Sequence, residues 1–283
     1  MNVLTAYRSL SAEQQRALRE KRLEVNRPIG PLLDFLRPLA ACDAMSDKAR
    51  TKLGCTFALS LGVLIFAAIF FASLWTTTAT LVVGALSVLM LLSGFFWRWT
   101  RSIDVSNNVR QFLLPVLTVL REDFDPQSPV HVRVDLSAPT APAKKRGESA
   151  PYAKGGYYKV IDTTYVDDWV ALDGILVDGT KLSWNVSDSI RERRKTKRNA
   201  RGKHKTKTSH KKKSNIEVSM ALRKKTYVLT ATEGEVSGDE KRHSVRLTRE
   251  VVTASLDPLD PRALLDLVAD VFRSARPAKE GGA

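Results

Sequence analysis

The sequence predicts an α+β membrane protein: a two-helix transmembrane hairpin with flanking cytoplasmic helices, followed by an antiparallel β domain. Three observations support this fold class. Residues 53–97 contain no Asp, Glu, Lys or Arg. From Val130 onward, apolar residues recur at every second position, as half-buried strands require. Residues 191–213 hold 13 Lys or Arg and a single acid, and they lie between two such alternating segments.

These patterns divide the chain into five segments. We expect a cytoplasmic helical segment at 1–52, a transmembrane hairpin at 53–97, a juxtamembrane helix at 98–127, a cytoplasmic β domain at 128–275 and a tail at 276–283. The two membrane spans are expected at 53–75 and 79–97, and a basic arm is expected at 187–214.

The uncharged stretch is long enough for two membrane passes of roughly 20 residues each. Thr76 to Thr80 interrupts it, so Trp75 is expected at one membrane interface and Trp97 at the other. The alternative is a buried helical hairpin in a soluble domain, but so many uncharged residues are hard to cover in a domain of this size. No ionisable residue lies within the spans, which argues against a transporter.

Basic residues flank both outer ends of the hairpin, and none lies in the connection. By the positive-inside rule, both termini are then cytoplasmic. Almost nothing would be exposed outside, which excludes a receptor for an external ligand. The compact topology favours the cytoplasmic (inner) membrane of a bacterium.

Small residues mark one face of the first span. Gly54, Ala58 and Gly62 recur at four-residue spacing, which allows close approach of helix backbones. We interpret this face as packing against the second span of the same chain, with self-association into a homo-oligomer as the alternative.

Three shorter helices are expected outside the membrane. Ser11 to Gln14 has the capping-box pattern, which predicts a helix that runs to about Val25. The apolar segments 32–42 and 112–120 are too short to span a bilayer and predict packing helices, the second kinked at Pro115.

Alternation predicts about seven antiparallel strands and one closing helix in the β domain. The expected strands are 130–136, 157–165, 169–177, 181–187, 216–222, 226–232 and 243–253. A long loop is expected at 138–156, a tight turn at Asp178 and Gly179, and a helix after Asp260. About seven strands followed by one helix predict a small barrel or sandwich with the helix closing one side. This order of elements resembles that of a pleckstrin-homology-like barrel, a likeness of fold that says little about function.

The basic residues are predicted to form the outer half of one long β-hairpin. Asn199 and Gly202 are spaced as in a type I turn that ends in a left-handed glycine. Paired residue numbers then sum to 402, which places Val186 opposite Ile216. A shift of one residue would place apolar side chains opposite polar ones. A continuous ribbon over 180–222 follows, with an arm about 40 Å long at roughly 3.3 Å per residue.

One face of this arm is predicted to bind a polyanion. Its odd-numbered basic residues are Arg191, Arg193, Lys195, Lys197, Lys203, Lys205, Lys207, Lys211 and Lys213. A basic residue near an anionic leaflet contributes about 1 kcal/mol, so anionic lipid headgroups are the expected partner. Nucleic acid is the alternative, although the arm sequence has no aromatic residue for base stacking. A third alternative is a neighbour's acidic segment at 161–180, whose carboxylates we interpret as turn-rich surface.

The arm is expected to be frayed when free, because like charges face each other across it and an isolated two-stranded ribbon is marginal in water. A disordered polar loop is the alternative. Anion binding would then order the arm.

No pattern in the sequence indicates catalysis. Phosphate-loop, nucleophile-elbow and zinc-protease motifs are missing, and Asp167–Asp168 is a weak metal signal. We therefore expect no enzyme, no cofactor and no metal site. The predicted function is a non-enzymatic membrane-anchored adaptor or scaffold. The alternatives are a membrane-tethered nucleic-acid or ribosome-associated factor and a subunit of a small oligomeric channel.

Overall fold

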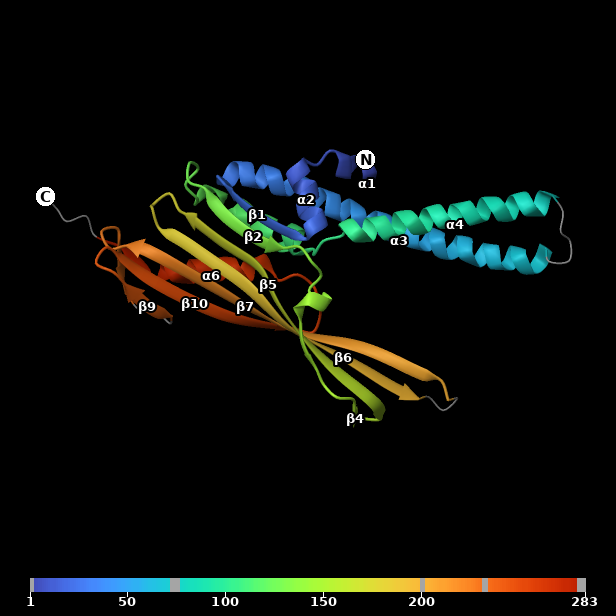
Figure 1. The fold of residues 1–283 in the computed structure, drawn as a ribbon. Helices are drawn as coiled ribbons and strands as arrows, with labels where there is room; N and C mark the ends of the chain where they lie inside the picture. The colour runs from blue at the N-terminus through green and yellow to red at the C-terminus, as the bar shows by residue number, and fades with distance from the viewer. Residues whose placement is uncertain (1–2, 72–76, 199–201, 231–233, 279–283) are drawn as a thin grey trace. The chain divides into compact units, whose positions relative to one another are not determined.

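The computed structural model describes residues 3–71, 77–198, 202–230 and 234–278. The chain forms two compact units. The first comprises Met1–Glu20 with Arg37–Val105, and the second comprises Lys21–Leu36 with Ser106–Ala283. The first unit is helical, and the second contains the β-sheet (Figure 1).

The first unit contains four helices. They are α1 (Val3–Arg8), α2 (Ala12–Glu20), α3 (Ile29–Phe71) from Arg37 onward, and α4 (Thr77–Ile103). The predicted capping box at the start of α2 is confirmed. The Ser11 amide donates to Gln14 Oε1 at 2.7 Å, and the Gln14 amide donates to Ser11 Oγ at 3.2 Å.

Helix α2 is shorter than the sequence indicates. It ends at Glu20, not near Val25, because Lys21 adopts a left-handed conformation with φ of 56°. The next residues form β1 (Arg22–Arg27), which pairs with β2 (Val130–Asp135) in the second unit. Leu23 and Val25 are buried, whereas Arg22 and Glu24 are exposed, so the residues expected to end a helix follow the period of a strand.

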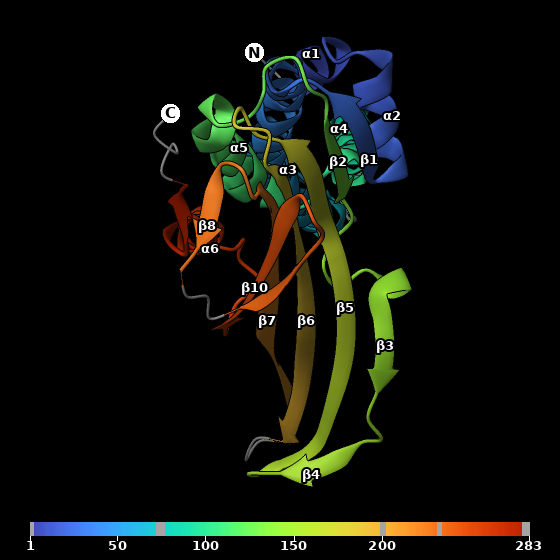
Figure 2. The ribbon, with the colours of Figure 1, turned by 90° about the vertical axis from the view of Figure 1, so that its left-hand side faces the viewer.

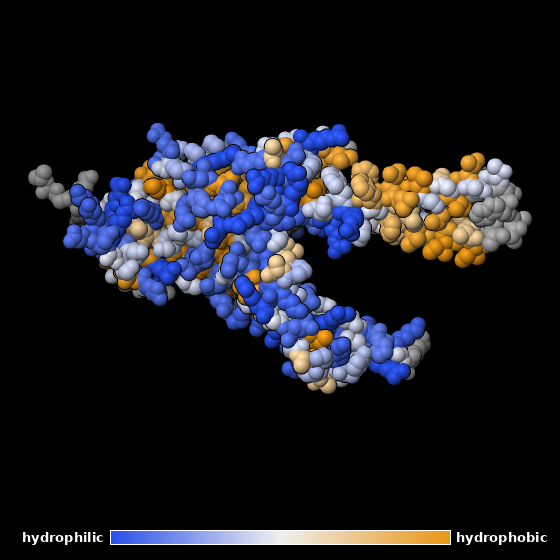
Figure 3. All heavy atoms as spheres, viewed as in Figure 1, coloured by the Kyte–Doolittle hydropathy of each residue, from blue (hydrophilic) through white to orange (hydrophobic). Residues whose placement is uncertain are grey.

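Helices α3 and α4 form an apolar hairpin, and both are long and apolar enough to cross a membrane. The qualifying stretches are Ile29–Ile69 and Thr80–Ile103. Only 11% and 6% of their most apolar windows are buried, whereas the core helices of a soluble protein are mostly buried. Figure 3 shows apolar side chains covering much of the visible face of this hairpin. The connection that contains Trp75 lies outside the described residues.

An antiparallel sheet of nine strands dominates the second unit, in the order β1-β2-β5-β6-β7-β10-β9, with β3 and β4 paired to β5. Its remaining strands are β3 (Lys145–Glu148), β4 (Tyr152–Lys154), β5 (Tyr157–Ile175), β6 (Lys181–Arg198), β7 (His204–Arg223), β9 (Glu235–Gly238) and β10 (Arg242–Thr253). A two-stranded sheet joins β8 (Tyr227–Leu229) to β11 (Ala275–Pro277).

The sheet does not close within the described residues, so the predicted barrel is wrong there, and the alternative of a sandwich is not confirmed. Its path ends at β1 on one side and β9 on the other, and these strands do not pair. Strands β5, β6 and β7 are 19, 18 and 20 residues long, far above the usual five or six. They run well beyond their helical cover, which gives the unit an open, extended sheet (Figure 2).

Two segments of the β domain differ from prediction. The strands expected at 157–165 and 169–177 are one strand, β5, which stays paired with β6 through an irregularity between Asp168 and Val170. The loop expected at 138–156 contains a 3-10 turn, η3 (Pro142–Lys144), and the strands β3 and β4. The first difference extends one strand, β5, along the basic arm, and the second adds two short strands that pair with β5.

The predicted β6–β7 register is confirmed over its whole described length. Pairs run from Lys181 opposite Ala221 to Arg198 opposite His204, and every pair sums to 402. The tight turn before β6 is also confirmed, since Gly179 has a φ of 76° and Leu176 donates to Thr180 O at 2.8 Å.

Helices cover the apolar face of the sheet. They are η1 (Val109–Leu113, a π-helix), α5 (Leu114–Val119), η2 (Leu120–Glu122) and α6 (Pro261–Arg273). Phe112 makes edge contacts with the rings of Trp169 and Trp184, at centroid distances of 5.3 and 6.2 Å. The predicted C-terminal helix is confirmed, with Asp260 Oδ1 accepting a hydrogen bond from the Arg262 amide at 3.0 Å.

Candidate polyanion-binding arm

The basic arm, residues 187–214, is the outer half of the β6–β7 hairpin. Gly202 has a φ of 76°, the left-handed conformation that the predicted turn requires. Asn199 and the next two residues lie outside the described residues. Like charges do face each other, as at Lys195 opposite Lys207. The sequence therefore placed the basic residues correctly along two paired strands.

The arm is not an isolated two-stranded ribbon. The expectation that it frays when free rested on that isolation, so its basis is wrong. Strand β5 pairs with β6 as far out as Lys159 opposite Thr196. Strands β3 and β4 pair with the other edge of β5 (Figure 2). Three or more strands support one another where two are marginal. Within the described residues, only the pairs from Lys197 outward lack this third strand.

Strand β5 also brings an acid to the arm. Asp162 accepts two hydrogen bonds from Arg193, at 2.6 and 2.7 Å, and one from the Tyr152 hydroxyl at 2.9 Å. The hydrogen bond from Arg193 holds the pKa of Asp162 at about 2. Asp162 belongs to the acidic segment that we interpreted as turn-rich surface. That interpretation is wrong here, because the acid fixes the arm to its own β5.

The remaining residues of the predicted basic face differ in their exposure. Lys213 contacts Glu250 at 3.0 Å. Lys195 is half-buried, and its ammonium lies 5.6 Å from the centre of the Tyr157 ring. The exposed members of the face are Arg191, Lys197, Lys203, Lys205, Lys207, Lys211 and Lys213. Seven of nine predicted residues are thus on the surface, while Arg193 is committed to a structural ion pair.

Aromatic residues lie beside the arm although its own sequence has none. Tyr157 is near the ammonium groups of Lys195 and Lys197. Tyr158 is 52% exposed, and its hydroxyl lies 2.8 Å from His204 Nδ1. An aromatic surface for stacking is therefore available beside the arm, although the arm's own sequence lacks one.

A buried charge cluster lies where the arm leaves the apolar core. It consists of the buried residues Lys144, Asp167, Asp188 and Lys212, with the partly exposed Asp135 at its edge. Asp167 on β5 is directly opposite Asp188 on β6, and the two residues are 1% and 2% exposed. The Lys144 ammonium lies 2.7 Å from Asp167 and 3.2 Å from Asp135. The Lys212 ammonium lies 3.8 Å from Asp188 and donates to the Asp257 carbonyl.

The cluster holds three carboxylates and two ammonium groups, so it has one acid in excess. Burial raises the pKa of Asp167 to about 6, and the charges of Asp135 and Asp188 act in the same direction. Burial also raises the pKa of Asp188, against the charge of Lys212. An excess acid in low dielectric is stabilised by binding a proton.

Sequence analysis missed this cluster. Asp167 was interpreted as surface or as a weak metal ligand, and Lys144 was placed in a loop. A signal was present, because the register that sums to 402 puts Asp188 and Lys212 on the even-numbered face with Val186 and Ile216. Opposite charges that interrupt a buried apolar face predict an internal ion pair.

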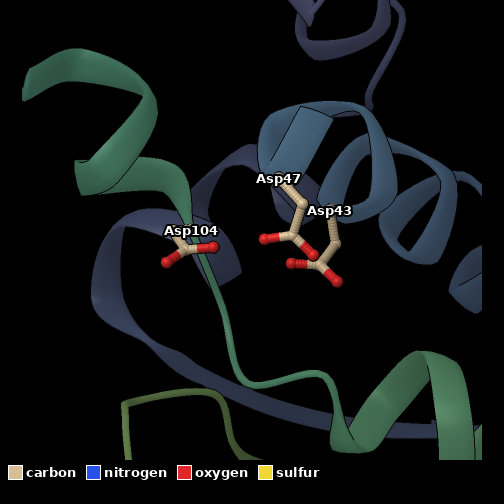
Figure 4. A group of neighbouring side chains, drawn as sticks. All are labelled: Asp43, Asp47 and Asp104. Carbon is tan, nitrogen blue, oxygen red and sulfur yellow. The ribbon is translucent and has the colours of Figure 1, made fainter. Parts of the chain in front are cut away.

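A second acidic group lies in the helical unit. Asp43 and Asp47 on α3 and Asp104 after α4 have carboxylate oxygens within 4.8 Å of one another (Figure 4). Arg50 donates to Asp104 and also to Asp47, the latter at 3.2 Å. Because one guanidinium already binds two of the three acids, we interpret the group as an ion-pair cluster, not as a metal site.

The three small residues of the first span have different surroundings. A Cβ atom on Gly54 would lie 3.3 Å from the indole nitrogen of Trp97 on α4, so glycine permits this close approach. Ala58 lines a cleft beside the same indole. Gly62 has open space where its Cβ would be. Close packing within the chain is thus seen at Gly54 but not at Gly62.

We predict that Lys212→Met destabilises the β domain by about 3 kcal/mol, because it leaves a buried carboxylate without its cation. Asp167→Asn should have a smaller effect, since it leaves two carboxylates for two ammonium groups. Chemical unfolding of the detergent-solubilised chain, followed by tryptophan fluorescence, measures both. Equal destabilisation by the two variants would contradict a cluster with one excess acid.

The same cluster predicts a pH dependence. The folded pKa of Asp167, about 6, is above its unfolded value, so its proton stabilises the fold at low pH and the contribution is lost as pH rises through 6. The contribution of Asp167 to the free energy of unfolding should therefore be about 1 kcal/mol larger at pH 5 than at pH 7.5. Asp167→Asn should remove that term. If Asp167→Asn unfolded with the same pH dependence as the wild type, Asp167 would not be the group responsible.

We predict that Arg193→Gln loosens the arm, because a bidentate, partly buried ion pair to β5 is lost. Hydrogen bonds between charged groups contribute about 1.5 to 3 kcal/mol, so amides over 159–166 and 190–196 should exchange at least tenfold faster. Arg191→Gln is the matched control, since Arg191 is exposed and lies one turn of the pleat away on the same face. Hydrogen–deuterium exchange with equal effects in both variants would show that the Asp162 pair does not hold the arm.

No protein-family model, no curated protein and no solved structure matches the chain. What the chain does is therefore inferred from the charge, exposure and contacts of its own residues.

Proposed function

We propose that this chain is a membrane-anchored, non-enzymatic adaptor whose β domain presents the basic arm to an anionic lipid surface. The observation that carries the proposal is the row of exposed cations along the arm. Among the described residues, Arg191, Lys205, Lys207 and Lys211 form no ion pair with a carboxylate. A dense set of cations without internal counter-charges is an electrostatic binding surface for a polyanion.

The apolar hairpin supports a membrane as the source of that polyanion. Its two helices have the length and composition of membrane spans, and few residues of their apolar windows are buried. Exposed apolar surface of this extent is unfavourable in water. Lys48, Arg50 and Lys52 precede the first span, and Arg98 and Arg101 follow the second, which favours both termini on the cytoplasmic side. The inner membrane of a bacterium fits this compact topology.

Nucleic acid is the second candidate, and one specific observation favours it. Tyr157 and Tyr158 lie beside the basic strands, and Tyr158 is exposed. Cations interleaved with aromatic rings are typical of surfaces that bind single-stranded nucleic acid. Lipid remains the first proposal because the hairpin supplies an independent reason for the chain to be at a membrane.

We predict that the full chain, reconstituted in phosphatidylcholine nanodiscs, co-sediments with vesicles that contain phosphatidylglycerol. Replacing Lys205, Lys207 and Lys211 with Gln should weaken this binding at least tenfold, since each cation contributes about 1 kcal/mol near an anionic surface. Raising the salt concentration should weaken binding of the wild type in the same direction.

A matched control replaces Lys224, Lys225 and Lys241, three exposed lysines outside the arm, with Gln. This variant has the same net charge as the arm variant and should bind within twofold of wild type. Duplex DNA and single-stranded RNA are titrated in parallel. Tighter binding to either nucleic acid than to the vesicles at physiological salt would replace the lipid proposal with the second candidate.

We also predict that the chain resists alkaline carbonate extraction and has a hairpin topology. In a background without Cys42 and Cys55, Thr76→Cys should react with a membrane-impermeant maleimide on intact cells. Ser237→Cys, on β9, should react only after the membrane is disrupted. Labelling of both positions on intact cells would contradict a cytoplasmic β domain.

A further inference from the structure

The apolar hairpin has a cleft at the end where its charged flanks begin. The cleft has a volume of about 590 Å³ and lies between α3 and α4. The residues that matter for its chemistry are Arg50, Gly54, Cys55, Ala58, Trp97 and Arg101. Two are cationic, one is an indole and three are small.

The indole of Trp97 forms one wall of the cleft, and its position is fixed from two sides. It stacks on Phe57, with a centroid distance of 6.4 Å and an interplanar angle of 5°. Gly54 permits its close approach, because a Cβ there would lie 3.3 Å from the indole nitrogen. The Arg101 guanidinium lies 5.8 Å from the ring centre. The Trp97 indole therefore has the Arg101 cation near its ring and the apolar Phe57 ring stacked on it.

The two arginines have different electrostatic roles. Arg50 is held by Asp47 and Asp104, so its charge is largely neutralised within the unit. Arg101 is exposed and forms no ion pair among the described residues. The cleft thus offers one guanidinium in excess at its entrance, which suits a ligand with a single negative charge.

The position of the cleft along the helices identifies the kind of ligand. Residues 53–97 contain no charged side chain, and Arg50 and Arg101 lie just outside this stretch at its two ends. The cations would lie at headgroup depth in a bilayer, with the floor of Gly54, Cys55 and Ala58 at the level of the first acyl carbons. A small-residue floor leaves room for a chain, and a tryptophan at the interface is typical of membrane proteins.

We propose that this cleft binds one anionic glycerophospholipid, with its phosphate on Arg101 and an acyl chain along the Gly54–Ala58 floor. The proposal rests on membrane insertion of the hairpin. Free phosphate would use the guanidinium but leave the apolar floor empty, whereas a phospholipid uses both. Basic pockets between membrane helices on the cytoplasmic side commonly hold anionic headgroups. This site is separate from the basic arm and binds a single lipid, not a surface.

Native mass spectrometry of the full chain tests the site. The chain is released from nanodiscs of equal phosphatidylglycerol and phosphatidylcholine. The Lys205, Lys207 and Lys211→Gln background reduces the contribution of the arm. The parent should retain one phosphatidylglycerol. Arg101→Gln should reduce the retained lipid at least fivefold. Arg98→Gln, which removes the same charge from an exposed position on α4 outside the cleft, should retain it within twofold.

A second pair of variants tests the floor without changing charge. Ala58→Phe fills the cleft and should reduce retention at least fivefold, whereas Leu59→Phe, at an exposed neighbouring position, should not. Equal losses in Arg101→Gln and Arg98→Gln, or equal retention of both lipids by the parent, would overturn the site. Carbonate extraction distinguishes the two failures: a chain that inserts but keeps no phosphatidylglycerol overturns the site alone, and a chain that does not insert overturns the proposed function as well.

Discussion

The register of the β6–β7 hairpin is the constraint on which the rest of the β domain depends. One alignment of two long strands places the apolar residues of the even-numbered face under the helices. The same alignment places most of the basic residues on the odd-numbered face of the arm. A shift of one residue would expose the core and bury lysines. The core therefore fixes the arm, because both belong to the same two strands.

The buried charge cluster lies where the same register costs free energy, because it buries charged side chains. Along the even-numbered face, Val186 and Ile216 belong to the apolar core, and Asp188 and Lys212 follow them outward. Taking such charges out of water costs several kcal/mol per ion unless the partners are well placed. The cluster binds three central strands to η3 at the junction of core and arm. We infer that the cluster selects the correct strand register at the junction instead of adding to net stability, since a misaligned strand would leave its charges unpaired.

Local patterns predicted the parts of the fold that are local. The capping box at Ser11, the turn at Gly179, the C-terminal helix and the hairpin register are all set by residues near in sequence. The errors concern pairing between distant segments. β1 joins a strand more than 100 residues away, and β3 and β4 are held by β5. The sequences of β3 and β4 carry little alternation, so pairing with β5 determines that they are strands. The basic face was predictable because it follows from the register of one hairpin. Its acid partner Asp162 was not, because that residue lies on a different strand, β5.

The arm contains its own competitor for anions, and this limits what it can bind. Asp162 occupies Arg193 at the base of the basic face, while farther out the described residues provide no comparable acid. Free cations therefore lie on both sides of Arg193, and those beyond Thr196, such as Lys205, lie where β5 no longer supports the ribbon. An anion that binds there contacts like-charged residues that face each other, such as Lys197 and Lys205, and relieves their repulsion. Binding and ordering of the tip are then coupled. A flat anionic surface, which meets the tip over several cations at once, fits this arrangement better than a compact ligand bound at one point.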